Sequence, residues 1–297
     1  MVNAQAARAP RTPWTAASPA ACAIGRAATL ALYDELALSP KPGLVTLTDR
    51  GSHDDMDART FMRSLIALRN YFRTIAALGA ARAPFDALER CGIDAEARML
   101  TATGGVNTHR GAIFTIGLLC ASAGALVAAN RRIDAGRLRA ELLERWGDAL
   151  VARAVRPSHL PGGQAARRLG LRSASAEASL GFPVLFDTAA PALRDALRRG
   201  MPADAARLDT LFHVIGVLDD ANLAHRGGLE GLRFAQRAAQ AFLAAGGSST
   251  SDGLARAQAI GRQFVARRLS PGGAADMLAA ACWLQRIGAS GSPGRVT

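Results

Sequence analysis

The segment of residues 111–129 contains no charged side chain, and it constrains the fold more than any other part of the sequence. About 20 apolar residues in succession can cross a bilayer as a helix, so the segment raises the question of a membrane span. It stands alone, however, and it is rich in Gly, Ala and Ser with few large side chains. This pattern favours a central helix that is buried on all sides of a globular protein.

A compact polar loop directly precedes the apolar segment. Two glycines interrupt any helix that reaches them, and four polar side chains follow. The first N–H groups of a helix are unpaired and lie at the positive end of the helix dipole, so this end suits an anion. We therefore predict an anion-binding loop, and its residues are Gly104, Gly105, Asn107, Thr108, His109 and Arg110.

The remaining segments are also typical of helices. No segment shows the sustained period-two alternation of a strand, and Gly/Pro-rich loops separate the apolar stretches. We predict an all-α protein with a single multi-helix globular domain over residues 18–288, whose active site is formed by loops at helix ends. Residues 1–17 are expected to be a disordered tail, and residues 289–297 a flexible one. The expected helices cover residues 20–38, 57–78, 82–103 (as one or two helices), 134–155, 184–199, 204–218, 231–245, 254–268 and a last segment ending near 287.

The chain carries a formal net charge of +12, almost all of it from arginine, since Lys41 is the sole lysine. A basic chain suggests polyanionic partners. The arginines are scattered and show no interleaving with aromatic residues, which argues against a nucleic-acid module. The four cysteines form no CxxC pair and lie in apolar helical segments, as expected of buried residues in a reducing compartment. With no apolar signal core near the N-terminus, we expect a cytoplasmic location.

Lys41 lies between two prolines in a stiff turn, and such a lysine suits phosphate binding as a point charge. The alternative is an ordinary exposed turn lysine. Just before this turn, Asp34 or Glu35 lies near the C-terminus of a helix, where a carboxylate is unfavourable. That misfit indicates either a function or a solvated side chain.

Two loops are rich in carboxylates. Residues 51–57 combine three acids with a histidine at a loop-to-helix junction, and residues 219–228 combine two acids with an asparagine and an arginine. Crowded carboxylates repel each other unless a cation joins them, and oxygen ligands beside a phosphate suggest Mg²⁺. The alternative for the first loop is that one acid caps the helix and the others are solvated.

Five motifs follow one another along the chain: SPKPGLV (39–45) with GSHDDMD (51–57), GVNTHRGAIF (105–114), EA (177–178) with GFP (181–183), DDAN (219–222) with RGG (226–228), and SPGGAAD (270–276). In this order they resemble the triphosphoribosyl-dephospho-coenzyme A synthase family. Each motif is weak alone, but the five in order are specific, and the resemblance covers residues 33–284.

The chain departs from the family pattern at three positions. Arg110 stands where the family often has lysine, and Ala221 where it usually has threonine. Ser175 stands at the arginine of the family's Arg-Gly-Glu-Ala block, which leaves that arginine's role unassigned. The stretches 171–174 and 225–228 look more like the malonate decarboxylase branch than the citrate lyase branch.

The resemblance implies a pentosyltransferase that joins the triphosphoribosyl part of ATP to the 2′-hydroxyl of 3′-dephospho-coenzyme A and releases adenine. The product would be the prosthetic-group precursor of the malonate decarboxylase acyl carrier protein, passed on to a holo-acyl-carrier-protein transferase. The same reaction for citrate lyase is the alternative. ATP and 3′-dephospho-coenzyme A are the expected partners, with no nucleic acid or membrane, and the sequence leaves room for a homo-oligomer.

This chemistry suits the polar residues of the loops. Breaking an N-glycosidic bond builds positive charge on the ribose, which carboxylates stabilise, while the attacking hydroxyl needs a base and adenine benefits from a proton. We assign acid–base catalysis to His53 or His109 without ranking them, with Asp55 and Glu177 as further catalytic candidates.

The binding roles complete the hypothesis. Mg²⁺ and the triphosphate are assigned to Asp55, Asp57 and Asp220, with Asn222 assisting. The substrate- and phosphate-binding candidates are Lys41, Gly43, Gly104, Gly105, Asn107, Thr108, Arg110, Arg226, Gly227, Gly228, Ser270, Gly272 and Gly273.

Two other functions fit parts of the pattern. An all-helical, Mg²⁺-dependent ADP-ribosyl hydrolase would show similar carboxylate-rich helix junctions. A non-catalytic basic helical module for RNA or an acidic protein would not require His53, Asp55 and Asn107 to lie together.

Overall fold

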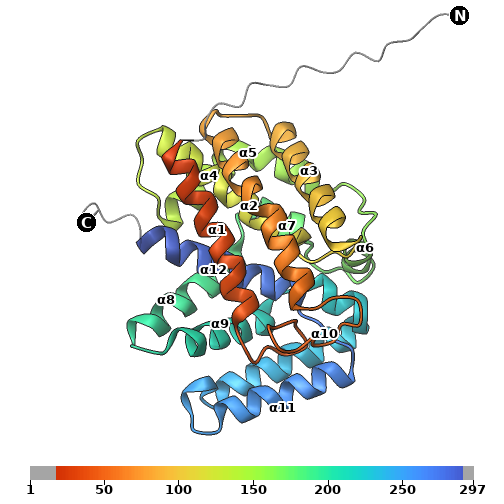
Figure 1. The fold of residues 1–297 in the computed structure, drawn as a ribbon. Coiled ribbons are helices and arrows are strands. Elements are labelled where there is room, and N and C mark those ends of the chain that lie inside the picture. Colours follow the sequence, from red (N-terminus) through yellow and green to blue (C-terminus); the bar gives the residue numbers. More distant parts are fainter. Residues whose placement is uncertain (1–17, 290–297) are drawn as a thin grey trace, which may run out of the picture.

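The apolar segment forms helix α4 (Arg110–Ala128), which lies among the other helices of an all-helical domain. The computed structural model describes residues 18–289, and no strand occurs within that range, so the all-α prediction is confirmed. The predicted tails, 1–17 and all but the first residue of 289–297, lie outside the described residues. The other elements are α1 (Pro19–Ala37), α2 (Ala58–Ala80), α3 (Phe85–Thr103), α5 (Ala135–Ala154), α6 (Pro161–Arg168), α7 (Ala174–Ser179), the π-helical turn η1 (Val184–Ala189), α8 (Ala190–Arg198), α9 (Ala203–Val217), α10 (Ala221–Ala244), the 3₁₀ turn η2 (Gly247–Ser249), α11 (Gly253–Ala266) and α12 (Gly272–Ala289) (Figure 1).

Helix α4 contacts α1, α2, α3, α5 and α12, so other helices surround it. Within residues 18–289 it is the one helix long and apolar enough to cross a membrane, yet 78% of that window is buried inside the protein. Its small residues allow close approach. A Cβ atom on Gly124 would lie 1.9 Å from the carbonyl oxygen of Ala76, and one on Gly79 of α2 would lie 1.9 Å from that of Ala121.

Gly79→Ala is expected to destabilise the protein by about 1–3 kcal/mol or more, because the added methyl group meets a backbone oxygen of α4 that moves only with its helix. Urea unfolding measures the loss. Gly147→Ala in α5 is the matched control, since no atom lies within 4 Å of a Cβ there. Alanine should stabilise that helix by up to about 1 kcal/mol. Equal stabilities of the two variants would contradict the close contact of α2 with α4.

Polar side chains cap the starts of several helices. Ser18, Asp57 and Asp220 each accept a hydrogen bond from an N–H in the first turn of α1, α2 and α10, respectively. These residue types favour helix starts because they satisfy N–H groups that have no partner inside the helix. Two of the carboxylates assigned to Mg²⁺ therefore have a structural task.

The second acidic turn is part of a longer helix than expected. The helix predicted at 231–245 begins at Ala221, directly after Asp220, and a kink at Gly228 (φ 63°, ψ −163°) interrupts it. The capping carboxylate starts the helix early, and a backbone conformation open to glycine lets its axis change direction.

Two segments expected to be loops are more ordered. Residues 161–168, between the helices predicted at 134–155 and 184–199, form α6, with Pro161 in its first turn. The link 246–252 contains η2, where the N–H of Ser248 donates to Asp209 Oδ1 at 2.9 Å. A hydrogen bond such as that between Ser248 and Asp209 joins residues far apart in the chain, and no local pattern in the sequence predicts it.

The cysteine prediction was half right. Cys120 and Cys282 are buried, whereas Cys91 is partly exposed and Cys22 is exposed on the outer face of α1.

The polar loops gather at one side of the fold. The loop joining α1 to α2 runs beside α10, drawn in red-orange and light blue in Figure 1. The side chain of Arg226 in α10 donates to the backbone of Ser52 at 2.9 Å, which fixes this contact. The starts of α10 and α12 are also joined, because Asp220 accepts the N–H of Ala274 at 2.9 Å.

Candidate functional site

Lys41 lies in a buried ion pair. Its Nζ is 2.5 Å from Glu35 Oε1 and 2.6 Å from the Glu35 backbone oxygen, and its side chain is only 1% exposed. Burial lowers the pKa of Lys41, and the Glu35 carboxylate opposes that decrease. The cation also offsets the dipole at the C-terminus of α1, which explains how a carboxylate is tolerated there. The alternative of an ordinary exposed turn lysine is therefore wrong.

The His53 loop is held against the loop before α12. Ser52 Oγ donates to the backbone oxygen of Leu269 at 2.6 Å, and His53 Nε2 lies 2.8 Å from Ser270 Oγ. Gly43 has φ +68°, and a Cβ atom there would lie 2.1 Å from the Leu269 oxygen. Only glycine permits this contact, so Gly43 serves loop packing.

Arg226 fixes the orientation of His53. One of its guanidinium nitrogens donates to the backbone oxygens of Ser52 and Arg268, and the other lies 3.1 Å from His53 Nδ1. Because arginine only donates, His53 Nδ1 must accept and Nε2 must carry the proton that Ser270 Oγ accepts. Burial lowers the pKa of His53, and the Arg226 charge lowers it further. The guanidinium of Arg226 therefore uses its hydrogen bonds to hold the neutral His53 in place.

The four residues predicted to bind Mg²⁺ do not form one ligand set. Asp57 accepts from Thr60, and both oxygens of Asp220 accept backbone N–H groups. The Asp55 carboxylate is 60% exposed, 3.6 Å from His53 and beyond hydrogen-bond distance. Among residues 18–289, no three acidic, histidine or cysteine side chains are grouped to hold a metal ion. The described side chains do not fit a metal held by protein ligands alone.

Gly104 and Gly105 of the predicted anion-binding loop end helix α3. The N–H groups of Gly104 and Gly105 both donate to the backbone oxygen of Leu100. Both glycines have positive φ, the conformation that commonly terminates helices. Their amides are thus already paired and do not point at a ligand.

The polar side chains that follow keep some capacity to bind. Asn107 Oδ1 accepts the N–H of Arg110 at 3.2 Å, and Arg110 Nε donates to Glu96 Oε1 at 2.6 Å. Thr108 Oγ1 is buried and has no hydrogen-bond partner in the part of the chain that is described. This loop therefore offers one unpaired hydroxyl and a partly exposed guanidinium.

The anion site predicted at the N-terminus of α4 is already occupied by a carboxyl group of the protein. Asp276 of α12 lies against the first turn of α4, because a Cβ atom on Gly111 would lie 1.9 Å from its Oδ2. Burial raises the pKa of Asp276 well above its usual range, and the charges of Glu35 and Asp220 raise it further, while the N–H of Ala112 opposes the rise. This carboxyl therefore keeps its proton to a higher pH than an exposed aspartate.

His109 is buried with one ring nitrogen satisfied. Nδ1 lies 2.6 Å from Ser64 Oγ, and Phe61 packs edge-on at 4.9 Å between ring centroids. Nε2 is buried and has no partner within the described residues. Burial lowers the pKa of His109 to about 3, and the charge of Lys41 contributes to the decrease. The imidazole is neutral at physiological pH and cannot act there as a protonated acid.

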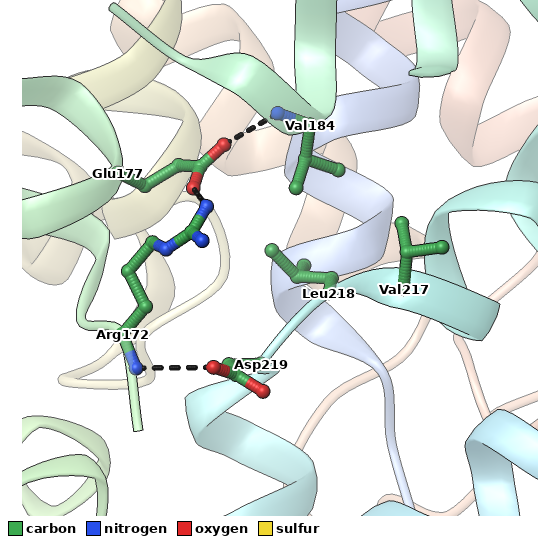
Figure 2. A pocket seen from close by; sticks show the side chains of 6 residues that line it. All are labelled: Arg172, Glu177, Val184, Val217, Leu218 and Asp219. Atoms are coloured by element: carbon green, nitrogen blue, oxygen red, sulfur yellow. Dashed lines mark hydrogen bonds and ion pairs between the residues drawn. The ribbon is translucent and has the colours of Figure 1, made fainter. Parts of the chain in front are cut away.

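Glu177 lies beside the Asp219 turn (Figure 2). Its Oε1 accepts the N–H of Val184 at 2.6 Å, and its Oε2 accepts from Arg172 Nη1 at 2.9 Å. The Arg172 backbone N–H reaches Asp219 at 3.2 Å. Arg172 is thus the guanidinium that pairs with Glu177 in this chain. The cavity here measures about 40 Å³, room for a few waters at most, and is lined by Arg172, Glu177, Val184, Val217, Leu218 and Asp219.

The remaining predicted glycines pack loops together. Cβ atoms would lie 2.7 Å from Asn222 Nδ2 at Gly272, 3.0 Å from Asp220 Oδ2 at Gly273 and 2.6 Å from Leu269 Cδ2 at Gly227. Gly228 supplies the kink in α10. These contacts explain the glycines without a phosphate.

The predicted loops do come together. The loop before α12 touches His53 and the Asp220 turn, and Asp276 of the same helix start touches Gly111 next to His109. Ser64 and Asp276 were not among the predicted site residues, although Asp276 closes the last motif. Of the two acids at the end of α1, Glu35 joins this cluster. Its neighbour Asp34 pairs elsewhere, with Arg286 and Arg207.

Comparison with known proteins gives concordant matches. The family model described as ATP:dephospho-CoA triphosphoribosyl transferase matches residues 21–293. A protein of Azotobacter vinelandii named "Probable 2-(5''-triphosphoribosyl)-3'-dephosphocoenzyme-A synthase" is 40% identical over 262 residues, 86% of this chain and 88% of its own. A protein of Acinetobacter calcoaceticus with the same name is 34% identical over 260 residues, 88% of this chain and 89% of its own. No solved structure matches.

Proposed function

The chain belongs to the ATP:dephospho-CoA triphosphoribosyl transferase family, and we propose that it transfers the triphosphoribosyl group of ATP to the 2′-hydroxyl of 3′-dephospho-coenzyme A and releases adenine. It is accordingly a transferase. The family match carries the proposal, because residues 21–293 include every polar loop that meets around the starts of α4, α10 and α12.

Within this function, the Asn107 loop is the proposed contact for substrate phosphates. The partly exposed Arg110 guanidinium, the Asn107 amide and the unpaired Thr108 hydroxyl lie next to one another in the chain. Lys41 and Arg226 are proposed to act indirectly, by holding Glu35 and His53. We separate these roles because Lys41 and Arg226 already donate hydrogen bonds inside the protein, whereas the Asn107 loop keeps groups that can bind a phosphate.

We further propose that Mg²⁺ enters with the triphosphate of ATP, with the exposed Asp55 carboxylate as its protein ligand. Mg²⁺ in such sites is commonly held by one or two carboxylates together with substrate phosphates. When bound it would neutralise phosphate charge.

The predicted outcome for the purified protein is adenine release that depends on both substrates. ATP with 3′-dephospho-coenzyme A and Mg²⁺ should give adenine and an adduct of the expected mass by liquid chromatography and mass spectrometry. Omission of the acceptor, or addition of excess chelator, should reduce adenine at least tenfold. Adenine or ribose products formed equally well without the acceptor would instead support a hydrolase. Salt-sensitive RNA binding without adenine release would support a binding module.

We place the chain in the malonate decarboxylase branch, on the residues at 171–174 and 225–228, with a holo-acyl-carrier-protein transferase as the next enzyme. Genes for malonate decarboxylase subunits are expected beside the gene for this chain. Citrate lyase genes in that position would overturn the assignment.

A further inference from the structure

A polar cluster under the loops contains two carboxyl groups, Glu35 and Asp276, that have no catalytic assignment so far. Glu35 and Asp276 come from opposite ends of the described chain, on α1 and α12. Burying a charged carboxylate is costly unless it is paired. The two carboxyl groups differ in whether a cation pairs with them.

Glu35 is paired with a cation. Its Oε1 forms the ion pair with Lys41, and its side chain is 6% exposed. The ion pair uses one carboxylate oxygen, and the second, Oε2, can accept from another partner. A carboxylate so placed can accept a proton.

Asp276 has no such pair among residues 18–289. Burial and the charges of Glu35 and Asp220 raise its pKa, and the N–H of Ala112 opposes the rise. Two carboxyl groups that share a site do not both ionise readily, and the unpaired one retains the proton. Asp276 is partly exposed, as is Ala275 beside it, so a ligand can reach it.

An unsatisfied histidine nitrogen marks the same place as a ligand site. The side chain of His109 is 3% exposed, and its Nε2 lacks a partner among the described residues, while Lys41 is the charge that acts on it. His109 is also separated by one residue from Gly111, against which Asp276 packs. Buried polar atoms are rarely left unpaired, so a bound molecule is expected to satisfy this nitrogen.

We propose that Asp276 is the general acid that protonates the departing adenine and that Glu35 is the general base that accepts the proton of the attacking 2′-hydroxyl. This assignment rests on the proposed function. Two carboxyl groups whose environments favour opposite protonation states are the usual arrangement for cleaving a glycosidic bond. His109 Nε2 gives the substrate a neutral hydrogen-bonding partner beside them.

The step balances without another reactant. The bond from ribose C1′ to adenine N9 breaks, its electron pair stays with adenine, and the proton of Asp276 moves to the adenine ring. The acceptor oxygen forms the new bond to C1′, and its proton moves to Glu35. Asp276 ends ionised and Glu35 protonated, so return of one proton from Glu35 to Asp276 through water restores both groups.

The test separates acid catalysis from a structural role by changing the leaving group. 7-Methyl-ATP carries a positively charged base that departs neutral, without gaining a proton. Asp276→Asn should lower the rate on ATP about 10²–10⁴-fold. On 7-methyl-ATP it should stay within about tenfold of the wild type. The rate of the wild type on ATP should fall at alkaline pH as Asp276, which faces the charges of Glu35 and Asp220, loses its proton. Asp276→Asn should lack this decrease.

Glu35→Gln should lower the rate on both substrates, because the hydroxyl still needs a base. Should that variant unfold, the double variant Glu35→Gln/Lys41→Met removes both charges of the pair and carries the same expectation. Asp148→Asn, an exposed aspartate of α5, is the control and should match the wild type on both substrates.

Equal losses on ATP and 7-methyl-ATP in Asp276→Asn would overturn the acid assignment, and a folded Glu35→Gln within tenfold of wild type would overturn the base. Both results presuppose an active wild type. No adenine from the wild type with both substrates present would overturn the proposed function itself.

Discussion

Replacing Lys41 with methionine is expected to lower the free energy of unfolding by about 3–5 kcal/mol, which would remove much of the stability of a typical domain. The ammonium group is the partner of a carboxylate that is 6% exposed. Methionine fills similar space but leaves Glu35 buried and charged, and removal of one partner from a buried pair costs far more than removal of both. Urea unfolding of the purified variant measures the change.

Two comparisons make this result specific to the buried pair. Glu35→Gln/Lys41→Met should recover most of the lost stability, because no charge is then buried alone. Arg110→Met breaks an ion pair whose side chains are 26% and 29% exposed, and should cost about 1 kcal/mol or less. A Lys41→Met variant as stable as Arg110→Met would show that Lys41 is not buried against Glu35.

Local patterns were enough to predict most of the long helices. The absence of charge over residues 111–129 was enough to predict α4 as the core. Asp57 is the instructive case, since the sequence allowed either a metal ligand or a helix cap and the structure shows a cap. An N-cap lies next to its helix in the chain, so its signal is local.

The partners of the polar residues could not be predicted in this way. Two flanking prolines indicated a stiff turn for Lys41, but whether its tip points to solvent or into the protein depends on how the turn docks on α1. The contact of Asp276 with Gly111 depends on α12 packing against α4. Such contacts join residues far apart in the chain, and no periodicity records them.

Glycine is the residue whose meaning depended most on the fold. From the motifs, Gly43, Gly272 and Gly273 were assigned to phosphate binding, and in the structure each lies against a neighbouring loop. Glycine suits both tasks because it lets the backbone approach closely, and the sequence alone does not say what approaches.

A substitution at Gly111 tests both the packing role of glycine and the assignment of Asp276 as the general acid. Like Gly79, it would place a Cβ atom 1.9 Å from an oxygen, but here the oxygen belongs to the short side chain of Asp276 and not to a helix backbone. Gly111→Ala should therefore displace the carboxylate and leave the helices in place. Because alanine also suits a helix better than glycine, we expect a much smaller loss of stability than for Gly79→Ala.

The expected activity of Gly111→Ala on ATP is about 10²–10⁴-fold below the wild type, the loss given by removal of a general acid. Since both changes remove the same interaction, Gly111→Ala/Asp276→Asn should be no slower than Asp276→Asn alone. Adenine release by the four proteins of this cycle, with urea unfolding of each, provides the measurement. Losses that multiply, or a Gly111→Ala variant with wild-type activity, would mean that Asp276 does not act from the position at the start of α4.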